Sequence, residues 1–333
     1  MKELMRMLSV LTGLCCITFL AMGEDAINYY NSGYAKAAKG DLKGAIADYN
    51  KAIELNPNDV KTLAGRGSIK DEIGDLNGAL ADFNKAIDLE PNNADTYISR
   101  GIAKINKRDI SGAFADFNKA IELKPDYFAP YYNRGTAKDA QGDLDGALAD
   151  YNKAIELKPD FANAYINRGI AKANKKDIQG AFADFNKAAE LQPDNYAPYY
   201  NRGKIENVQG KLDGALADFN KAIELRPDYV DAYVSRGEVK YKKGDLDAAI
   251  TDINKAIELR PNGDNSFLNR GVVKYKKGDM NGALSDYNKA IELNPNNALA
   301  YKNRYYVRQA KGDSSGAQAD LKKAIELNSQ KGE

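Results

Sequence analysis

The side chains that most often carry out catalysis are scarce in this sequence. It contains no histidine, and its two cysteines, Cys15 and Cys16, both lie within residues 1–23. Histidine is the residue that most often titrates near neutral pH and the commonest ligand for transition metals, so acid–base catalysis and zinc or iron sites are not expected. If residues 1–23 are removed, no thiol remains to act as a nucleophile or to form a disulfide. The composition therefore predicts a protein that is not an enzyme and that uses neither a metal nor another cofactor.

The chain also lacks the charge imbalance that nucleic-acid-binding proteins usually have. It carries 48 basic and 47 acidic side chains. Removal of residues 1–23 takes away Lys2, Arg6 and Glu3, which leaves equal numbers of the two signs. A balanced surface produces no long-range field to attract a polyanion. We therefore expect no nucleic-acid partner.

The segment Asp143-Leu144-Asp145-Gly146 looks like the start of a calcium-binding loop. It lacks the further oxygen ligands and the closing glutamate that such a loop needs. It also stands where a helix is expected to begin, and an aspartate at that point can accept hydrogen bonds from the first turn. We therefore interpret Asp143 as a helix N-cap.

Arginine and aspartate recur at matched positions along the chain. The arginines are Arg66, Arg100, Arg134, Arg168, Arg202, Arg236, Arg270 and Arg304, and the aspartates are Asp48, Asp82, Asp116, Asp150, Asp184, Asp218, Asp252, Asp286 and Asp320. They could form a charged ladder that binds a ligand, or pairs that join neighbouring helices through the two-pronged guanidinium. Because a ligand rarely demands equal spacing along a whole array, we favour structural pairs.

Proline and glycine show that this spacing is a repeat of 34 residues. The prolines are Pro57, Pro91, Pro125, Pro159, Pro193, Pro227, Pro261 and Pro295, and the glycines are Gly33, Gly67, Gly101, Gly135, Gly169, Gly203, Gly237 and Gly271. Counting Ala26 as position 1, the units are 26–59, 60–93, 94–127, 128–161, 162–195, 196–229, 230–263, 264–297 and 298–331. A fixed period of this length is typical of solenoid proteins. We expect a repeat domain over residues 24–331, followed by a tail at 332–333.

Each unit has the pattern of two amphipathic helices. In the third unit, residues spaced by three and four form one face of a first helix: Ala94, Tyr97, Gly101 and Lys104. The apolar face of a second helix is formed by Ala113, Phe117, Ala120, Ile121 and Leu123. Arg108-Asp109 makes the turn between them, and Pro125 must end the second helix because it lacks a backbone N–H. Each unit is therefore predicted to be a helical hairpin, with helix A followed by helix B.

This pattern resembles the tetratricopeptide repeat (TPR) family over essentially all of the repeat region. In the third unit the matching residues are Tyr97, Gly101, Ala113, Phe117, Ala120 and Pro125. The resemblance implies an all-α fold, a right-handed superhelical solenoid of antiparallel helix pairs, with helix A lining the concave side. Position 7 departs from the family, since it is often leucine there and is arginine here. Position 11, often tyrosine in the family, is mostly lysine.

The resemblance also implies a non-enzymatic scaffold for protein–protein interaction, with a peptide groove on helix A. Position 5 is apolar or aromatic in eight of nine units, and position 6 is asparagine in six. An asparagine amide both donates and accepts, so such a row could pair with the backbone of an extended peptide while position 5 holds its side chains. The candidate groove residues are Tyr30, Asn31, Ile98, Tyr132, Asn133, Ile166, Asn167, Tyr200, Asn201, Leu268, Asn269 and Asn303.

Other interpretations of this surface stay open. The asparagines could simply pack locally, and tyrosine with asparagine also suits the faces and hydroxyls of a glycan, although the chain has no tryptophan. A clamp for acidic C-termini, as in TPR co-chaperones, is not expected, because lysine occupies position 5 only at Lys302 and position 9 has no asparagine. The identity of the protein or peptide partner does not follow from the sequence.

Residues 1–23 have the order of regions found in secretory signal peptides. Lys2 and Arg6 precede an apolar run over residues 7–20, and small residues at Ala21 and Gly23 follow before the acidic Glu24. We therefore expect a cleaved signal peptide and a periplasmic or secreted protein. The alternative is a retained anchor, although the run is shorter than the roughly 20 residues that a spanning helix needs. In that case the protein would contact the membrane and could be an assembly factor for envelope machinery.

Overall fold

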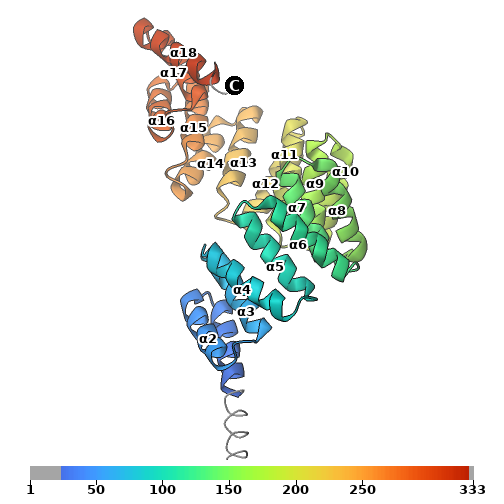
Figure 1. Ribbon diagram of the computed structural model, residues 1–333. Coiled ribbons are helices and arrows are strands. Elements are labelled where there is room, and N and C mark those ends of the chain that lie inside the picture. The colour runs from blue at the N-terminus through green and yellow to red at the C-terminus, as the bar shows by residue number, and fades with distance from the viewer. Residues whose placement is uncertain (1–23, 330–333) are drawn as a thin grey trace, which may run out of the picture. The chain divides into compact units, whose positions relative to one another are not determined.

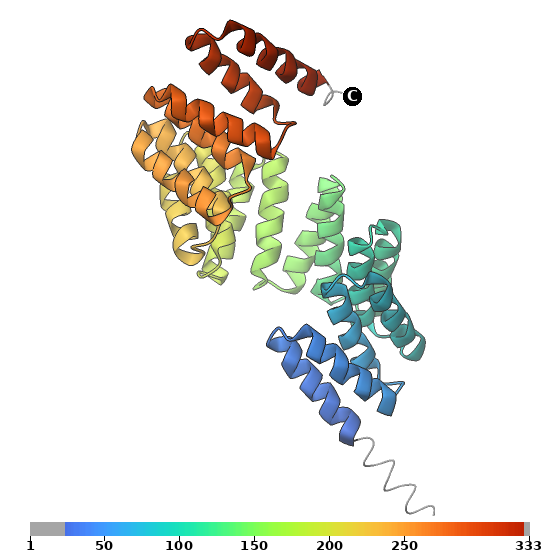
Figure 2. The same ribbon diagram turned by 90° about the vertical axis from the view of Figure 1, so that its left-hand side faces the viewer.

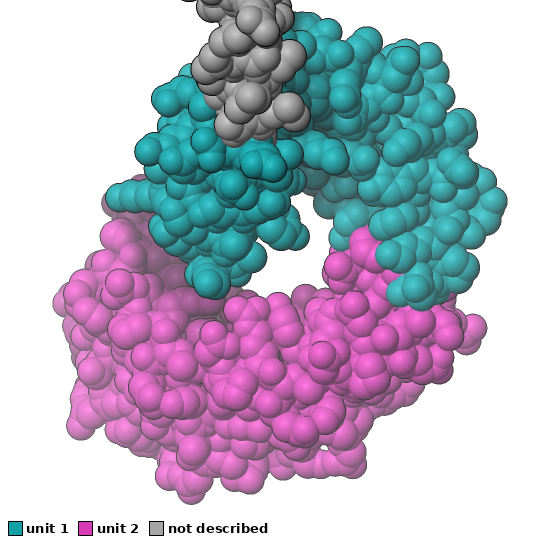
Figure 3. All heavy atoms as spheres, turned by 90° about the horizontal axis from the view of Figure 1, so that it is seen from below, with its two compact units in different colours: residues 1–160 teal, residues 161–333 magenta. Residues whose placement is uncertain are grey.

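The computed structural model describes residues 24–329, which form helices joined by short turns (Figure 1). The predicted signal peptide at 1–23 and the tail at 332–333 lie outside the described residues. The chain divides into two compact units, residues 1–160 and 161–333 (Figure 3).

In the first unit, helical residues 24–38 come first. They are followed by α2 (Leu42–Leu55), α3 (Val60–Glu72), α4 (Leu76–Leu89), α5 (Ala94–Asn106), α6 (Ile110–Leu123), α7 (Phe128–Ala140) and α8 (Leu144–Leu157). The second unit contains α9 (Ala162–Asn174), α10 (Ile178–Leu191), α11 (Tyr196–Val208), α12 (Leu212–Leu225), α13 (Val230–Lys243), α14 (Leu246–Leu259), α15 (Asp264–Lys277), α16 (Met280–Leu293), α17 (Ala298–Ala310) and α18 (Ser314–Ser329).

Within each unit, successive helices pack against one another as a stack of hairpins. In the first unit α3 packs on α4, α5 on α6 and α7 on α8, while α4 also contacts α5 and α6 contacts α7. The second unit repeats this order from α9 to α18 (Figure 2). The predicted all-α solenoid of antiparallel helix pairs is confirmed.

Local sequence explains where these helices begin and end. The Asp143 carboxylate accepts a hydrogen bond from the Gly146 backbone N–H at 2.9 Å, which confirms that Asp143 is the N-cap of α8. Helix A of the same repeat ends before Gly142, whose φ of 82° is easily adopted only by glycine. Pro159 lies just beyond the C-cap of α8, where a helix cannot continue. The predicted helix boundaries therefore follow from caps and breakers that the sequence displays.

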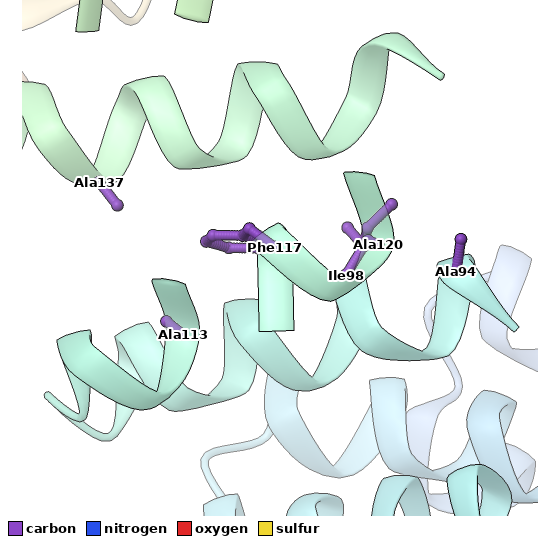
Figure 4. Packing of buried hydrophobic residues seen from close by; sticks show 6 residues of the cluster. All are labelled: Ala94, Ile98, Ala113, Phe117, Ala120 and Ala137. Atoms are coloured by element: carbon purple, nitrogen blue, oxygen red, sulfur yellow. The ribbon is translucent and has the colours of Figure 1, made fainter. Parts of the chain in front are cut away.

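Glycine and alanine allow the two helices of a repeat to approach closely. A Cβ added at Gly101 would lie only 2.6 Å from a ring carbon of Phe117 on the facing helix. Ala113 and Ala120 are fully buried in the same cluster as Phe117, together with Ala94, Ile98 and Ala137 (Figure 4). Large and small side chains thus interlock at the density of a protein core.

Candidate functional site

The candidate site is the surface of the A helices, and a repeated charge network fixes their orientation. In the fourth repeat, Arg134 on α7 makes two hydrogen bonds to the Asp150 carboxylate on α8, at 2.9 and 2.6 Å. Its third nitrogen, Nη1, donates to Asn118 on helix α6 of the preceding repeat at 2.5 Å. Lys138 places a second cation 2.8 Å from Asp150. One arginine therefore connects three helices.

The arginine–aspartate pair of this network recurs through both units. Bidentate pairs join Arg66 to Asp82, Arg100 to Asp116, Arg168 to Asp184, Arg202 to Asp218, Arg236 to Asp252, Arg270 to Asp286 and Arg304 to Asp320. All of these aspartates are buried, so they are not accessible to a ligand. The predicted structural pairing is confirmed.

The ion pairs of this network shift the pKa values of their members toward the charged forms. The hydrogen bond to Asp150 raises the pKa of the Arg134 guanidinium. In the first repeat serine replaces the arginine, and Lys36 with Ser32 hydrogen-bonds to Asp48, which lowers the pKa of that carboxyl. These groups stay ionised near neutral pH and act as fixed links between helices.

The position-5 residues do not form one continuous exposed row. Ile98 is 7%, Ile166 6% and Leu268 7% exposed, because these side chains lie in the core between adjacent helices. They are therefore not open pockets for a partner's side chains.

The position-5 tyrosines are half-buried. Each turns one side toward the ring of its own helix B, with centroids 5.9 Å apart for Tyr30 and Tyr49, 6.1 Å for Tyr132 and Tyr151, and 5.9 Å for Tyr200 and Phe219. Burial raises the pKa of Tyr200, which keeps its hydroxyl protonated. The remaining part of each ring belongs to the helix A surface.

The position-6 asparagines are half-buried or exposed, and the side chains of Asn133 and Asn201 bond to their own helix. The side-chain amides of Asn133 and Asn201 donate to the carbonyls of Ala129 and Ala197, both at 2.9 Å. This contact does not use the amide oxygen, which can accept a hydrogen bond. Asn31 is exposed, and Asn167, Asn269 and Asn303 are half-buried.

A hollow of about 510 Å³ crosses three successive A helices of the first unit. Tyr30 and Tyr34 line it from residues 24–38, Ser68 from α3, and Ser99 from α5. An adjoining hollow of about 440 Å³ shares Tyr30 with the first and is also lined by Asn31. The structure thus brings the predicted Tyr30 together with Asn31 in one hollow and with Tyr34 in the other. Tyr34 is 66% exposed and was not among the predicted residues.

The second unit has an apolar pocket of about 340 Å³ between α9, α10 and α11. Among the predicted residues Asn201 lines it, together with Ile170 and Lys204 from position 9 of their repeats. The predicted groove residues include none from position 9. Its side chains Tyr34, Ser68, Ile170 and Lys204 line hollows, whereas several position-5 side chains fill the core.

The described residues give two further findings. Between residues 24 and 329, no group of three or more acidic side chains is placed to hold a metal ion. Every helix in this same range is too short or too polar to span a bilayer.

Family models for tetratricopeptide repeats match more than half of the chain. The model described as "TPR repeat" matches residues 33–70, 72–107, 140–176, 203–244 and 237–278. Two described as "Tetratricopeptide repeat" match residues 265–297, and residues 94–127 and 162–195. No curated protein matches the sequence.

Solved structures share the fold at low sequence identity. The Cut9–Hcn1 hetero-tetramer of the APC/C has a chain with a TM-score of 0.63 and 19% identity; the match covers 80% of this chain and 52% of that one. This chain thus corresponds to about half the length of that relative. A tetratricopeptide repeat protein from Parabacteroides merdae has a TM-score of 0.57 and 21% identity, with 74% and 98% covered. With the repeat models matched along both units, the chain belongs to the tetratricopeptide repeat family.

Proposed function

We propose that this protein binds an extended segment of a partner polypeptide along the surface of its A helices. Membership of the TPR family and the stacked hairpins support a protein-interaction scaffold. The observation that carries the finer proposal is the hollow of about 510 Å³ that continues over three A helices, from Tyr34 past Ser68 to Ser99. A groove that crosses repeats suits a chain lying across them, with phenol and hydroxyl groups to bond its peptide units.

The asparagines support the same proposal. In Asn133 and Asn201 one side-chain N–H donates to the helix backbone, so each amide oxygen is presented in a fixed direction to accept from a partner's backbone. Each such bond contributes about 0.5–1.5 kcal/mol. Substituting Asn133, Asn167 and Asn201 by alanine should therefore weaken binding by about one to three orders of magnitude.

The test begins with a pull-down by the chain lacking residues 1–23 from the envelope fraction of its source, with partners identified by mass spectrometry. Affinity for the recovered partner is then compared between the parent and the triple variant. A matched control replaces three exposed loop asparagines, Asn58, Asn262 and Asn296, by alanine. If the variant with alanine at Asn133, Asn167 and Asn201 binds the partner with parental affinity, the proposal is overturned. Oligosaccharide binding lost in that variant would instead support a glycan reader.

We also propose that the protein is exported after cleavage near Gly23. The support is the order of charged, apolar and small residues in 1–23. N-terminal sequencing of the protein from its source should begin at or near Glu24. An intact Met1 on a cytosolic protein would contradict export, and an intact Met1 in the membrane fraction would favour a tethered assembly factor.

A further inference from the structure

Residues 94–161 and residues 162–229 are near copies of each other, offset by 68 residues, and the differences between them point to a binding pocket in the second copy. Repeats three and four contain Ala129-Pro130-Tyr131-Tyr132-Asn133-Arg134-Gly135, and repeats five and six contain Ala197-Pro198-Tyr199-Tyr200-Asn201-Arg202-Gly203. At position 12 of the first repeat in each copy, however, Ile105 corresponds to Ala173. Ile105 is partly buried and packs against the cluster that contains Phe117 and Ala137. Its counterpart Ala173 is three carbons smaller.

An apolar pocket occupies the corresponding place in the second copy. Its volume is about 340 Å³, and Ala173 lines it with Ile170, Ile178, Phe185, Ile205 and Val208. Val208 is 86% exposed, which is unusual for a valine beside an apolar hollow. Ile205 stands where the first copy has the buried Ala137, so the large and the small residue of this interior pair have changed places between the two helices. Val208 stands where the first copy has the exposed Ala140 and adds carbon atoms at the mouth.

Charge at the mouth also differs between the copies. Lys204 lines the pocket where the first copy has Thr136. Lys204 is exposed, and its ammonium lies 5.5 Å from the centroid of the Tyr200 ring. Among the described residues that line the pocket, Lys204 is the only charged one, and the others with polar side chains are Asn174, Asn201 and Gln209. The mouth is therefore cationic.

We propose that this pocket receives one aliphatic or aromatic side chain from an acidic, extended segment of the partner. The inference rests on the proposed function and specifies the partner's chemistry. Burial of the apolar side chain against Ile170, Phe185 and Val208 provides affinity. A carboxylate beside it in the partner pairs with Lys204, which has no acidic neighbour in the lining.

The probe is a displayed library of random dodecapeptides, selected on the chain lacking residues 1–23. Enriched peptides should carry leucine, isoleucine, phenylalanine or methionine next to aspartate or glutamate. A library that yields no enriched sequence, or only basic ones, overturns the inference. Affinities of the enriched peptides are then measured by fluorescence anisotropy on three variants.

Ala173→Ile restores the residue of the first copy and should weaken binding at least about tenfold by filling the pocket. Val208→Ser removes an exposed apolar wall without touching the core, and should weaken binding several-fold even if Ala173→Ile disturbs folding. Lys204→Glu should weaken binding and reduce its dependence on salt. The matched control Ala140→Ile adds the same atoms at an exposed site in the first copy and should bind as the parent does.

Two failures can be told apart. Parental affinity in both Ala173→Ile and Val208→Ser, with a loss in the variant lacking Asn133, Asn167 and Asn201, overturns the pocket while the groove stands. Parental affinity in all of these variants overturns the proposed function as well.

Discussion

Repeats four and six come from the two near copies, yet the charges of two positions beside the start of helix B are exchanged between them. In repeat four Lys138 pairs with Asp150 at 2.8 Å, and Asp143 caps α8. In repeat six these two positions are Glu206 and Lys211. Lys211 makes no side-chain cap for α12, and the Glu206 carboxylate lies over the first turn instead, so close that a Cβ on Gly214 would be 2.5 Å from its oxygen.

This exchange keeps the total charge but weakens the local network. Asp218 pairs with Arg202, while Glu206, a like charge, stands where the other repeats have a second cation. Glu206 Oε2 is buried without a hydrogen-bond partner among the described residues. Burial first, and the neighbouring Asp218 second, raise the pKa of Glu206. The fold thus tolerates a buried, unpaired carboxylate in repeat six, because packing against the adjacent repeats stabilises this repeat.

Loss of the arginine should have the largest effect, and the effect should differ between the copies. Arg202→Leu leaves Asp218 buried beside Glu206 with no cation in direct contact. This change should lower the free energy of unfolding by about 3–5 kcal/mol. Arg134→Leu leaves Asp150 paired with Lys138 and should cost about 1–3 kcal/mol. Hydrogen exchange of the α8 and α12 amides reports the two repeats separately. Equal losses would mean that the second cation contributes nothing.

Restoring the usual charges should strengthen repeat six. In Glu206→Lys/Lys211→Asp, a lysine returns to Asp218 and an aspartate caps α12, for a gain of about 1–3 kcal/mol. Lys211→Asp alone should destabilise the repeat, because it adds a third carboxylate beside Glu206 and Asp218. The reciprocal Lys138→Glu/Asp143→Lys variant should weaken repeat four. Single changes whose effects simply add would contradict coupling between the two positions.

Repeat six should also respond to pH in the opposite sense to an ordinary salt-bridged carboxylate. Because the folded state raises the pKa of Glu206, its ionised form destabilises the fold. That penalty is fully present above the raised pKa and disappears as the pH falls below the ordinary value of about 4.5. Glu206→Gln should therefore be more stable than the parent at neutral pH, and the difference should shrink in acid. Urea unfolding of both proteins across this range provides the measurement, and a constant difference would contradict the assignment.

Much of the scaffold could be predicted because it depends on local signals that recur. Pro159 and Gly142 mark the ends of helices whatever their neighbours are, and the pairing of Arg134 with Asp150 could be inferred from their common period. Asn118 and Lys138 complete that network at positions that recur as well, since position 25 is asparagine in eight units and position 11 is usually lysine. The recurrence of asparagine at position 25 and lysine at position 11 could therefore have predicted their part in the network.

The groove was harder to predict because it depends on how neighbouring hairpins rotate against each other. Ile98 lies in the core cluster of its repeat, whereas Tyr132 at the same position is only half-buried, and the repeat pattern alone does not distinguish the two cases. The pocket beside Ala173 is lined by several residues that differ from the first copy, among them Ile205 and Val208, and these come together only when α9 packs against α11. The sequence therefore predicted the helix A surface more accurately than it predicted which residues line the hollows on that surface.

The smallest expected effect concerns a feature that the two copies share, and so tests whether their difference is confined to repeat six. In repeats three and five the turn after helix A uses Arg108 and Lys176 at φ of 65° and 66°, where other repeats have glycine. A side chain in this left-handed conformation costs about 1–2 kcal/mol, partly offset by the greater freedom that glycine has in the unfolded chain. Arg108→Gly and Lys176→Gly should thus each raise the free energy of unfolding by about 0.5–1 kcal/mol.

The two turns are alike in their surroundings. Both side chains are exposed, and the backbone N–H groups of Asp109 and Asp177 donate to the carbonyls of Lys104 and Lys172 at 2.8 and 2.9 Å. Because these turns match so closely, hydrogen exchange of α6 and α10 should show equal gains. Unequal gains would mean that the copies also differ in how their A helices end, and the contrast between them would then extend beyond Glu206 and Lys211.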